Sequence, residues 1–171
     1  MARTGRNNGD GTRAWLTRET CAGVMRLLSA AGQAVLSEVP LANGRRADVM
    51  AVTARGEITI VEVKSSAEDF RADGKWPDYL PFCDRFYFAV PAHLPHDLTP
   101  VDEGLIVADR WGGEIIRKAV RRTLPAARRK ALLIQFAHVS ATRLQRLQDS
   151  LITQNRENGK TGAFPIPREE I

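Results

Sequence analysis

Three apolar runs of strand length, separated by two glycine turns, constrain the fold of this chain most strongly. The runs occupy residues 34–41, 46–52 and 57–65. Asn43-Gly44 and Arg55-Gly56 supply turn sequences that are common in β-hairpins. Because consecutive strands joined by such short turns usually pair with each other, the sequence predicts a three-stranded antiparallel meander.

A helix is predicted on the amino-terminal side of this meander. Apolar residues repeat at helical spacing from Leu16 to Ala31, and Gly32 is a suitable residue for a helix stop. Residues 1–12 are rich in glycine, asparagine and charge, a composition typical of a flexible tail.

Further elements are predicted after the meander. Residues 67–84 are expected to form a loop and a short helix, because Pro77 is tolerated only in a first helical turn. Residues 85–90 and 104–109 are rich in branched and aromatic side chains and are predicted to be strands. Beyond Pro125, apolar residues again keep helical spacing, which predicts a long or broken final helix.

These elements predict an α/β fold in one domain. Its core has the order helix, three-stranded meander, helix, strand, and an additional strand and a C-terminal helix follow. The length of 171 residues suits a single hydrophobic core. The predicted domain covers residues 13–153, and residues 154–171 are predicted to be a loose tail.

Opposite charges occur near the end of the third run, at positions where a buried strand would carry apolar side chains. Glu62 and Lys64 share one face of the predicted strand because side chains alternate. Asp48, on the preceding strand, can approach them if the two strands pair as a hairpin. Two carboxylates repel unless a cation compensates their charge, and hard oxygen ligands are those that Mg²⁺ prefers. The pattern therefore predicts a metal site with a lysine beside it.

Asp48, followed fourteen residues later by Glu62-Val63-Lys64, resembles the PD-(D/E)XK nuclease superfamily, as does the order of the elements. This resemblance implies a restriction-endonuclease-like core. It also implies that Asp48, Glu62 and the carbonyl of Val63 hold Mg²⁺ or Mn²⁺, while Lys64 positions or activates the attacking water. Ala47 stands where the motif usually has proline.

An acid on the first helix completes the constellation in the superfamily, and Glu19 matches that position. Glu38 is an alternative for the same role from the first strand, although an exposed polar residue on an edge strand is the preferred interpretation of it.

Lys75 and Tyr79 provide a second match. RecB-like members of the superfamily carry Q-x-x-x-Y on the second helix, and this chain has lysine in place of the glutamine. One helical turn would put both side chains on one face, where they could reach a phosphate or Lys64.

The excess of positive charge is concentrated in one segment. The net charge is +5, and seven basic residues fall within fourteen positions that contain no acid. Such a run is typical of a phosphate-contacting surface, or else of a solvated face. Its members are Arg117, Lys118, Arg121, Arg122, Arg128, Arg129 and Lys130.

Most of the chain, roughly residues 17–147, is similar to the MmcB-like DNA repair family of alphaproteobacteria. This resemblance implies a role in DNA repair or damage tolerance. Two functions follow from it: a Mg²⁺-dependent DNA nuclease, or a non-catalytic DNA-binding repair accessory that keeps the nuclease fold. An RNA substrate, a homodimer and contacts with other repair proteins stay open.

The remaining composition argues against export and structural metal. No apolar run is long enough to span a membrane and the amino terminus lacks a signal-peptide pattern, so a cytoplasmic protein with no membrane partner is predicted. Cys21 and Cys83 lie in apolar patterns without metal-ligand spacing and are predicted to be buried free thiols.

Overall fold

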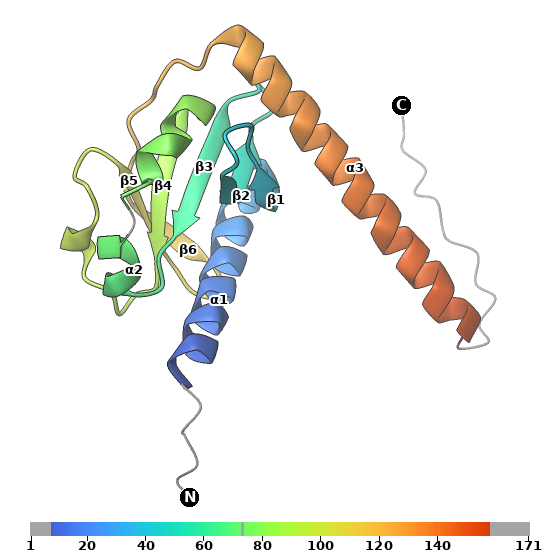
Figure 1. The fold of residues 1–171 in the computed structure, drawn as a ribbon, viewed down its shortest axis with the longest axis horizontal. Helices are drawn as coiled ribbons and strands as arrows, with labels where there is room; N and C mark the ends of the chain where they lie inside the picture. The colour runs from blue at the N-terminus through green and yellow to red at the C-terminus, as the bar shows by residue number, and fades with distance from the viewer. Residues whose placement is uncertain (1–7, 73, 158–171) are drawn as a thin grey trace, which may run out of the picture. The chain divides into compact units, whose positions relative to one another are not determined.

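The computed structural model describes residues 8–72 and 74–157 of the chain. The chain divides into a first unit that ends at Ile134 and a second that begins at Gln135. The described part of the second unit is the remainder of the last helix. The elements, labelled in Figure 1, are α1 (Asn8–Ala30), β1 (Ala34–Pro40), β2 (Arg46–Val52), β3 (Ile58–Val63), α2 (Ala67–Ala72), the 3₁₀-helix η1 (Trp76–Phe82), β4 (Arg85–Val90), the 3₁₀-helix η2 (His96–Leu98), β5 (Gly104–Ala108), β6 (Gly113–Arg117) and α3 (Ala126–Glu157).

The strands in the described residues form one sheet in the order β1-β2-β3-β4-β5-β6. The first three make the antiparallel meander that the sequence predicts, and Gly56 turns the chain between β2 and β3 with a φ of 76°. Glycine adopts this backbone conformation without the steric cost that a Cβ would add. β3, β4 and β5 are parallel, and β6 returns antiparallel to β5. The predicted α/β class is confirmed.

The parallel strands give the sheet two distinct ends. We call the end at which β3, β4 and β5 finish the carboxyl edge, and the end at which they begin the amino edge. The arrowhead of β3 in Figure 1 points to the carboxyl edge. Because β2 runs antiparallel to β3, the first residues of β2 also lie at the carboxyl edge.

Helix α1 covers one face of the sheet. Val24 and Leu28 of α1 pack against alternate strand residues in a buried apolar cluster. The strand residues of this cluster include Val49, Ala51, Val61, Val63, Tyr87, Ala89, Ile106 and Ala108. Since neighbouring strand residues point to opposite faces, Asp48 and Glu62 belong to the face away from α1.

Aromatic side chains cover that second face. Phe86 and Phe88 of β4 contact each other at a centroid distance of 5.0 Å, and Trp76 lies 5.8 Å from Phe86. Phe70 of α2 and Tyr79 of η1 complete the group, at 4.9 Å from Phe88 and 5.9 Å from Phe86 respectively. The sheet is therefore packed between α1 and a layer formed by α2 and η1.

Three boundaries differ from the sequence-based predictions. α1 begins at Asn8, within the segment assigned to a tail, and α3 continues to Glu157. The rest of both predicted tails, residues 1–7 and 158–171, lies outside the described residues. The predicted second helix divides into the short α2 and the 3₁₀-helix η1, which contains two prolines.

Strand β6 was not predicted. Its side chains are mostly exposed, so the period-two alternation that marks a half-buried strand is missing. None of the helices in the described residues is long and apolar enough to cross a membrane.

Candidate functional site

The two predicted metal-binding carboxylates meet at the carboxyl edge. The antiparallel register pairs Val49 with Val61. Asp48, one residue before Val49, and Glu62, one residue after Val61, therefore face each other on the same side of the sheet. Lys64 follows two residues after Glu62 and shares that side. The structure thus brings together the three residues that the sequence pattern singles out.

Asp48 is held by the backbone of the neighbouring strand. Its Oδ2 accepts a hydrogen bond of 2.8 Å from the N–H of Val63. Burial raises the pKa of the Asp48 carboxyl above its usual value, and the Val63 N–H and the positive charges of Lys64 and Arg46 oppose that effect. The carboxylate form of Asp48 is therefore under-compensated in this environment.

Glu62 and Lys64 form a buried ion pair. The Lys64 Nζ donates to Glu62 Oε1 at 3.1 Å, and the two residues are only 7% and 8% exposed. Charges this deeply buried are maintained only when they are paired or hydrogen-bonded. The pair fixes the ammonium group close to Asp48, where it acts on the Asp48 carboxyl electrostatically.

Glu38, the alternative supporting acid, lies beside this group. The β1–β2 register pairs Ser37 with Val49 and Val39 with Ala47, which puts Glu38 opposite Asp48. The Glu38 charge contributes to the raised pKa of Asp48, and Glu38 Oε1 lies 3.5 Å from Arg46 Nη2. Glu38 has a φ of 49°, which is uncommon for a residue with a side chain.

Glu19 points elsewhere. Its Oε2 lies 3.7 Å from Arg110 Nε in the turn between β5 and β6, and Glu19 lines a pocket next to that turn. The physical reason is that α1 packs on the face of the sheet away from Asp48 and Glu62. Of the two candidate supporting acids, Glu38 and not Glu19 therefore lies beside Asp48.

The negative charges of the same acids act on the thiol of Cys21 in α1. Burial raises the pKa of the Cys21 thiol to about 12, with further contributions from Asp48, Glu38 and Glu62. Burial likewise raises the pKa of Cys83 to about 12. Both cysteines are free, as predicted, but only Cys83 is buried and Cys21 is partly exposed.

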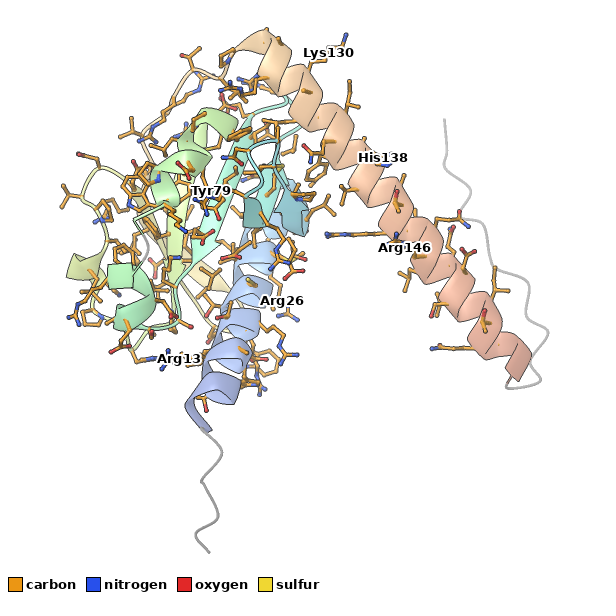
Figure 2. The ribbon with its side chains drawn as sticks, viewed as in Figure 1. Arg13, Arg26, Tyr79, Lys130, His138 and Arg146 are labelled. Carbon is orange, nitrogen blue, oxygen red and sulfur yellow. The ribbon has the colours of Figure 1, made fainter. Side chains whose placement is uncertain are left out.

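Lys75 and Tyr79 are separated by the geometry of η1. Lys75 precedes the 3₁₀-helix and is exposed, whereas Tyr79, labelled in Figure 2, is buried. A 3₁₀-helix has three residues per turn, so positions four apart do not share a face as they do in an α-helix. The Tyr79 hydroxyl donates to the carbonyl of Arg46 at 3.2 Å. Tyr79 therefore anchors the start of the strand that carries Asp48.

The predicted phosphate-binding run lies at the amino edge, away from Asp48. Arg129 donates two hydrogen bonds to Asp84, at 2.6 and 2.7 Å, and a third to the carbonyl of Gly56. Arg122 pairs with Glu103 at 2.5 Å. Asp84 and Glu103 are almost fully buried and stand just before β4 and β5 respectively.

The other arginines of the run make similar contacts. Arg117 donates to Thr99 and to the carbonyls of Pro100 and Glu103. Arg121 lies 2.8 Å from Glu57, and Arg128 donates to the carbonyl of Pro81. All five arginines of the run thus tie the stretch from the end of β6 to the first turn of α3 to the amino edge, while Lys118 and Lys130 are exposed. Contact with DNA through this run stays a prediction.

The donor set at the carboxyl edge fits a hard divalent cation. In residues 8–72 and 74–157, no three His, Cys, Asp or Glu side chains gather in a group that could hold a metal ion. Mg²⁺, however, is usually bound through one or two carboxylates and keeps several waters. Asp48 and Glu62 supply two carboxylates, and a cation would offset the buried charge of Asp48. Carboxylate and carbonyl oxygens suit Mg²⁺ or Mn²⁺.

Comparison with known proteins identifies the family. A family model described as DNA repair protein MmcB-like matches residues 7–151. The chain belongs to this family. Membership gives this MmcB-like protein a role in DNA repair, and hence an interaction with DNA.

A solved structure of a related protein agrees with the fold of the MmcB-like chain. The SPO1766 protein of unknown function from Silicibacter pomeroyi is 43% identical, with a TM-score of 0.76. The match covers 78% of this chain and 92% of that chain. No curated protein matches the MmcB-like chain.

Proposed function

We propose that this MmcB-like protein is a Mg²⁺-dependent nuclease that hydrolyses DNA phosphodiester bonds during repair. The observation that supports the proposal is the convergence of Asp48, Glu62 and Lys64 at the carboxyl edge. Two carboxylates beside an ammonium group, in the chain order of the PD-(D/E)XK nucleases, are suited to phosphodiester hydrolysis.

Asp48, Glu62 and the Val63 carbonyl would hold the metal ion. When bound, such an ion neutralises charge that develops on the phosphate and lowers the pKa of a bound water. The chain itself supplies orientation: the Val63 N–H fixes Asp48 Oδ2, and Glu62 Oε1 fixes the Lys64 ammonium. Lys64 would donate a hydrogen bond to the attacking water or to a phosphate oxygen and so keep the two in line.

Three other residues would act on this centre indirectly. Glu38 would add negative charge next to Asp48 and strengthen cation binding. Tyr79 is a positioning residue, because it holds the backbone two residues before Asp48. Lys75, exposed beside Trp76, would offer positive charge to a phosphate on the same face of the sheet.

The second candidate is a DNA-binding repair accessory without turnover. One observation favours it: Glu62 and Lys64 pair with each other, and Asp48 accepts a backbone N–H, so the chain itself supplies partners to all three charges. A group of charges that has partners within the chain can persist in a protein that no longer cuts DNA.

Cleavage assays distinguish the two functions. Purified full-length protein is incubated with end-labelled single-stranded, duplex, flapped and branched DNA, each with Mg²⁺, Mn²⁺ or EDTA. The nuclease proposal predicts products with at least one substrate in Mg²⁺ or Mn²⁺ and none in EDTA. If the protein binds DNA but leaves every substrate intact with both metals, the accessory function is supported instead.

Variants of the central residues exclude a contaminating nuclease. Lys64→Met keeps most of the side-chain volume, and Asp48→Asn keeps an acceptor for the Val63 N–H. Both should lose cleavage when purified in the same way as the wild type. Asp102→Asn alters an exposed aspartate at the amino edge and should cleave normally. Cleavage that survives in both central variants would belong to another protein or another site.

A further inference from the structure

Two exposed tryptophans lie at the carboxyl edge, outside the group formed by Asp48, Glu62 and Lys64. Trp15 of α1 is 50% exposed, and Trp111, in the turn between β5 and β6, is 73% exposed. Both line one pocket of about 370 Å³. Large flat apolar side chains that are left in water at one place on a surface usually mark a binding site.

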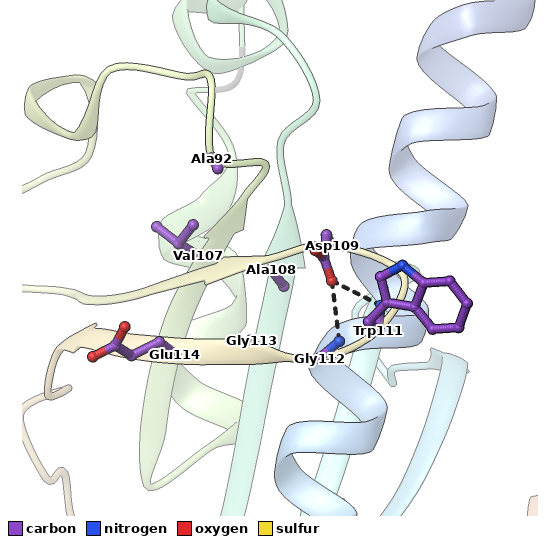
Figure 3. A pocket seen from close by; sticks show the side chains of 8 residues that line it. All are labelled: Ala92, Val107, Ala108, Asp109, Trp111, Gly112, Gly113 and Glu114. Carbon is purple, nitrogen blue, oxygen red and sulfur yellow. Dashed lines mark hydrogen bonds between the residues drawn. The ribbon is translucent and has the colours of Figure 1, made fainter.

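The turn that carries Trp111 is firmly braced. Asp109 Oδ1 accepts hydrogen bonds from the N–H groups of Trp111 and Gly112, at 2.7 and 3.1 Å, and Figure 3 shows both bonds. The Asp109 N–H donates to the Gly112 carbonyl at 3.0 Å. These bonds brace the backbone of the turn that carries the exposed indole.

Helix α1 packs directly against the same turn. A Cβ on Gly23 would lie 1.8 Å from the Asp109 carbonyl oxygen and 2.4 Å from that of Gly112. Only glycine permits this close approach of the helix. Arg26 also donates a hydrogen bond to the Arg110 carbonyl. The turn is therefore ordered before a ligand binds, and binding does not lose the conformational entropy of ordering it.

Trp111 lines two pockets. The first, shared with Trp15, is also lined by Pro91, His93 and Arg110. The second, of about 390 Å³, is bordered by Ala92, Val107, Gly113 and Glu114, as Figure 3 shows. Volumes of this size are in the usual range for small-molecule sites. A flat ring could therefore lie against the indole of Trp111.

Arginine side chains stand close to both tryptophans. The Arg110 guanidinium lies 4.6 Å from the centroid of the Trp111 ring, and Arg18 is one helical turn from Trp15. Two acids also line the first pocket: Glu19 pairs with Arg110, and Asp109 accepts the two backbone N–H groups. Exposed Glu114 at the second pocket adds a negative charge.

We propose that Trp15 and Trp111 bind unpaired bases of single-stranded DNA by stacking, while Arg110 and Arg18 contact the adjoining phosphates. Indole rings stack on every base, and cations beside them attract the backbone, which is the combination that sequence-tolerant single-strand binding requires. The inference deepens the proposed function, because it assigns an unpaired substrate strand to the same edge of the sheet.

The topology makes one strand of DNA able to reach both places. Trp111 follows β5 and Lys64 follows β3, and only β4 lies between these parallel strands. Two strand spacings amount to about 10 Å across the sheet. DNA that stacks on Trp111 could therefore run along the carboxyl edge and cross from the α1 face to the face that carries Asp48 and Glu62.

Binding in EDTA tests the inference without cleavage. Fluorescence anisotropy measures the affinity of the full chain for a labelled oligo(dT), for an abasic strand of the same length and for a duplex. Trp15→Ala and Trp111→Ala should each bind oligo(dT) about 5- to 150-fold more weakly than the wild type. Their affinity for the abasic strand and for the duplex should stay close to that of the wild type. Trp111→Phe, which keeps a ring, should retain most of the oligo(dT) affinity.

A matched control separates stacking from general loss of apolar surface. Val101 is an exposed apolar residue at the amino edge, and Val101→Ala should bind all three ligands as the wild type does. Melting curves verify that each variant is folded. Wild-type affinity for oligo(dT) in both tryptophan-to-alanine variants would overturn the inference and leave the two rings as a surface for a protein partner. An equal loss on the abasic strand would also overturn it.

The stacking site and the nuclease proposal can each fail without the other. If the tryptophan variants bind oligo(dT) normally while the wild type cuts DNA in Mg²⁺, the stacking site is wrong and the nuclease stands. If the variants lose oligo(dT) affinity while no substrate is cut, the stacking site stands and the nuclease is wrong.

Discussion

Asp48 meets two opposing requirements. In the proposed metal site it would have to be ionised, yet burial favours its neutral form and raises its pKa. The Val63 N–H, Lys64 and Arg46 offset only part of the burial. A bound cation would supply the missing compensation.

The raised pKa of Asp48 predicts how stability depends on pH. The folded chain holds the Asp48 proton more tightly than the unfolded chain, so Asp48 lowers stability as pH rises above the ordinary aspartate pKa of about 3.9. Asp48→Asn removes this effect and still accepts the Val63 N–H. In EDTA, we expect Asp48→Asn to melt at a higher temperature than the wild type at pH 7, with a smaller difference at pH 4.

Asp102→Asn is the control for this measurement, since its carboxyl is exposed and its replacement should change the melting temperature little at either pH. A lower melting temperature for Asp48→Asn at pH 7 would mean that the carboxylate is fully compensated within the chain.

Glu38 carries a second residue-scale prediction. Its φ of 49° costs about 1–2 kcal/mol for a residue with a Cβ. Glu38→Gly should therefore raise the free energy of unfolding by about 1 kcal/mol, or at least not lower it. Ser37→Gly, one position earlier in the same strand, should lower it by roughly 0.5–1 kcal/mol. Urea unfolding measures both. Equal losses in the two variants would show that the Glu38 backbone is unstrained.

The site was only partly predictable from the sequence. Strand alternation and one hairpin turn suffice to bring Asp48, Glu62 and Lys64 to the same side of the sheet. The contact of Glu19 with Arg110 depends on which face α1 covers, and that is decided by packing over the whole sheet. The positive φ of Glu38 likewise has no signal in the sequence, because glutamate is not a residue that favours it.

At the scale of elements, Arg129 joins α3 to the sheet. Desolvation opposes ionisation of Asp84, but hydrogen bonds from Arg129 and from the N–H groups of Ile58 and Leu124 outweigh it and hold the Asp84 pKa below its usual range. The Asp84 side chain is 1% exposed. Removal of Arg129 would thus leave a buried carboxylate with one of its main partners missing.

We expect Arg129→Met to lower the free energy of unfolding by about 3–5 kcal/mol at pH 7. A depressed pKa stabilises the fold above the unfolded-state value, and this contribution is lost as pH falls through the folded-state pKa. The deficit of Arg129→Met relative to the wild type should therefore shrink in acid. Denaturant unfolding at pH 7 and pH 3 measures it.

Arg128→Met is the matched control, because the neighbouring arginine is exposed and contacts the Pro81 carbonyl and the Phe82 ring rather than a buried carboxylate. It should cost less than about 1 kcal/mol. A similar cost for the two arginines would contradict a structural role that is specific to Arg129.

The elements show why some predictions succeeded and others did not. The meander and β4 have clear alternation or branched runs bounded by glycine or charged residues, and β2 and β4 were predicted with the observed boundaries. The basic run looked like one functional surface because its partners, Asp84 and Glu103, lie far away in the sequence. Only the fold reveals that its arginines are paired.

At the scale of the whole first unit, the sheet separates two basic surfaces. The basic run is at the amino edge, whereas Arg13 and Arg18 of α1 are on the part of the helix that also carries Trp15. β3 alone spans about 20 Å between the edges. DNA bound next to Asp48 would therefore contact the carboxyl edge and leave most of the amino edge free.

Two double variants with the same change in net charge test this arrangement. Arg13→Glu with Arg18→Glu should weaken binding of single-stranded DNA and reduce the salt dependence of the affinity by about one to two ions. Lys118→Glu with Lys130→Glu, at the amino edge, should do so much less. Affinities are measured by anisotropy between 50 and 200 mM salt, a range in which phosphate contacts have a strong effect. A larger effect from the lysine pair would indicate that DNA binds at the basic run instead.

Binding of Mn²⁺ tests most directly whether Asp48 and Glu62 form a metal centre. Electron paramagnetic resonance of free Mn²⁺ is recorded as wild-type protein is added, with and without single-stranded DNA, and is repeated with Asp48→Asn and Asp102→Asn. The account predicts that the wild type and Asp102→Asn remove about one ion per chain from solution, and that Asp48→Asn removes far less. Equal uptake by Asp48→Asn and the wild type, or no uptake by the wild type even with DNA, would contradict it.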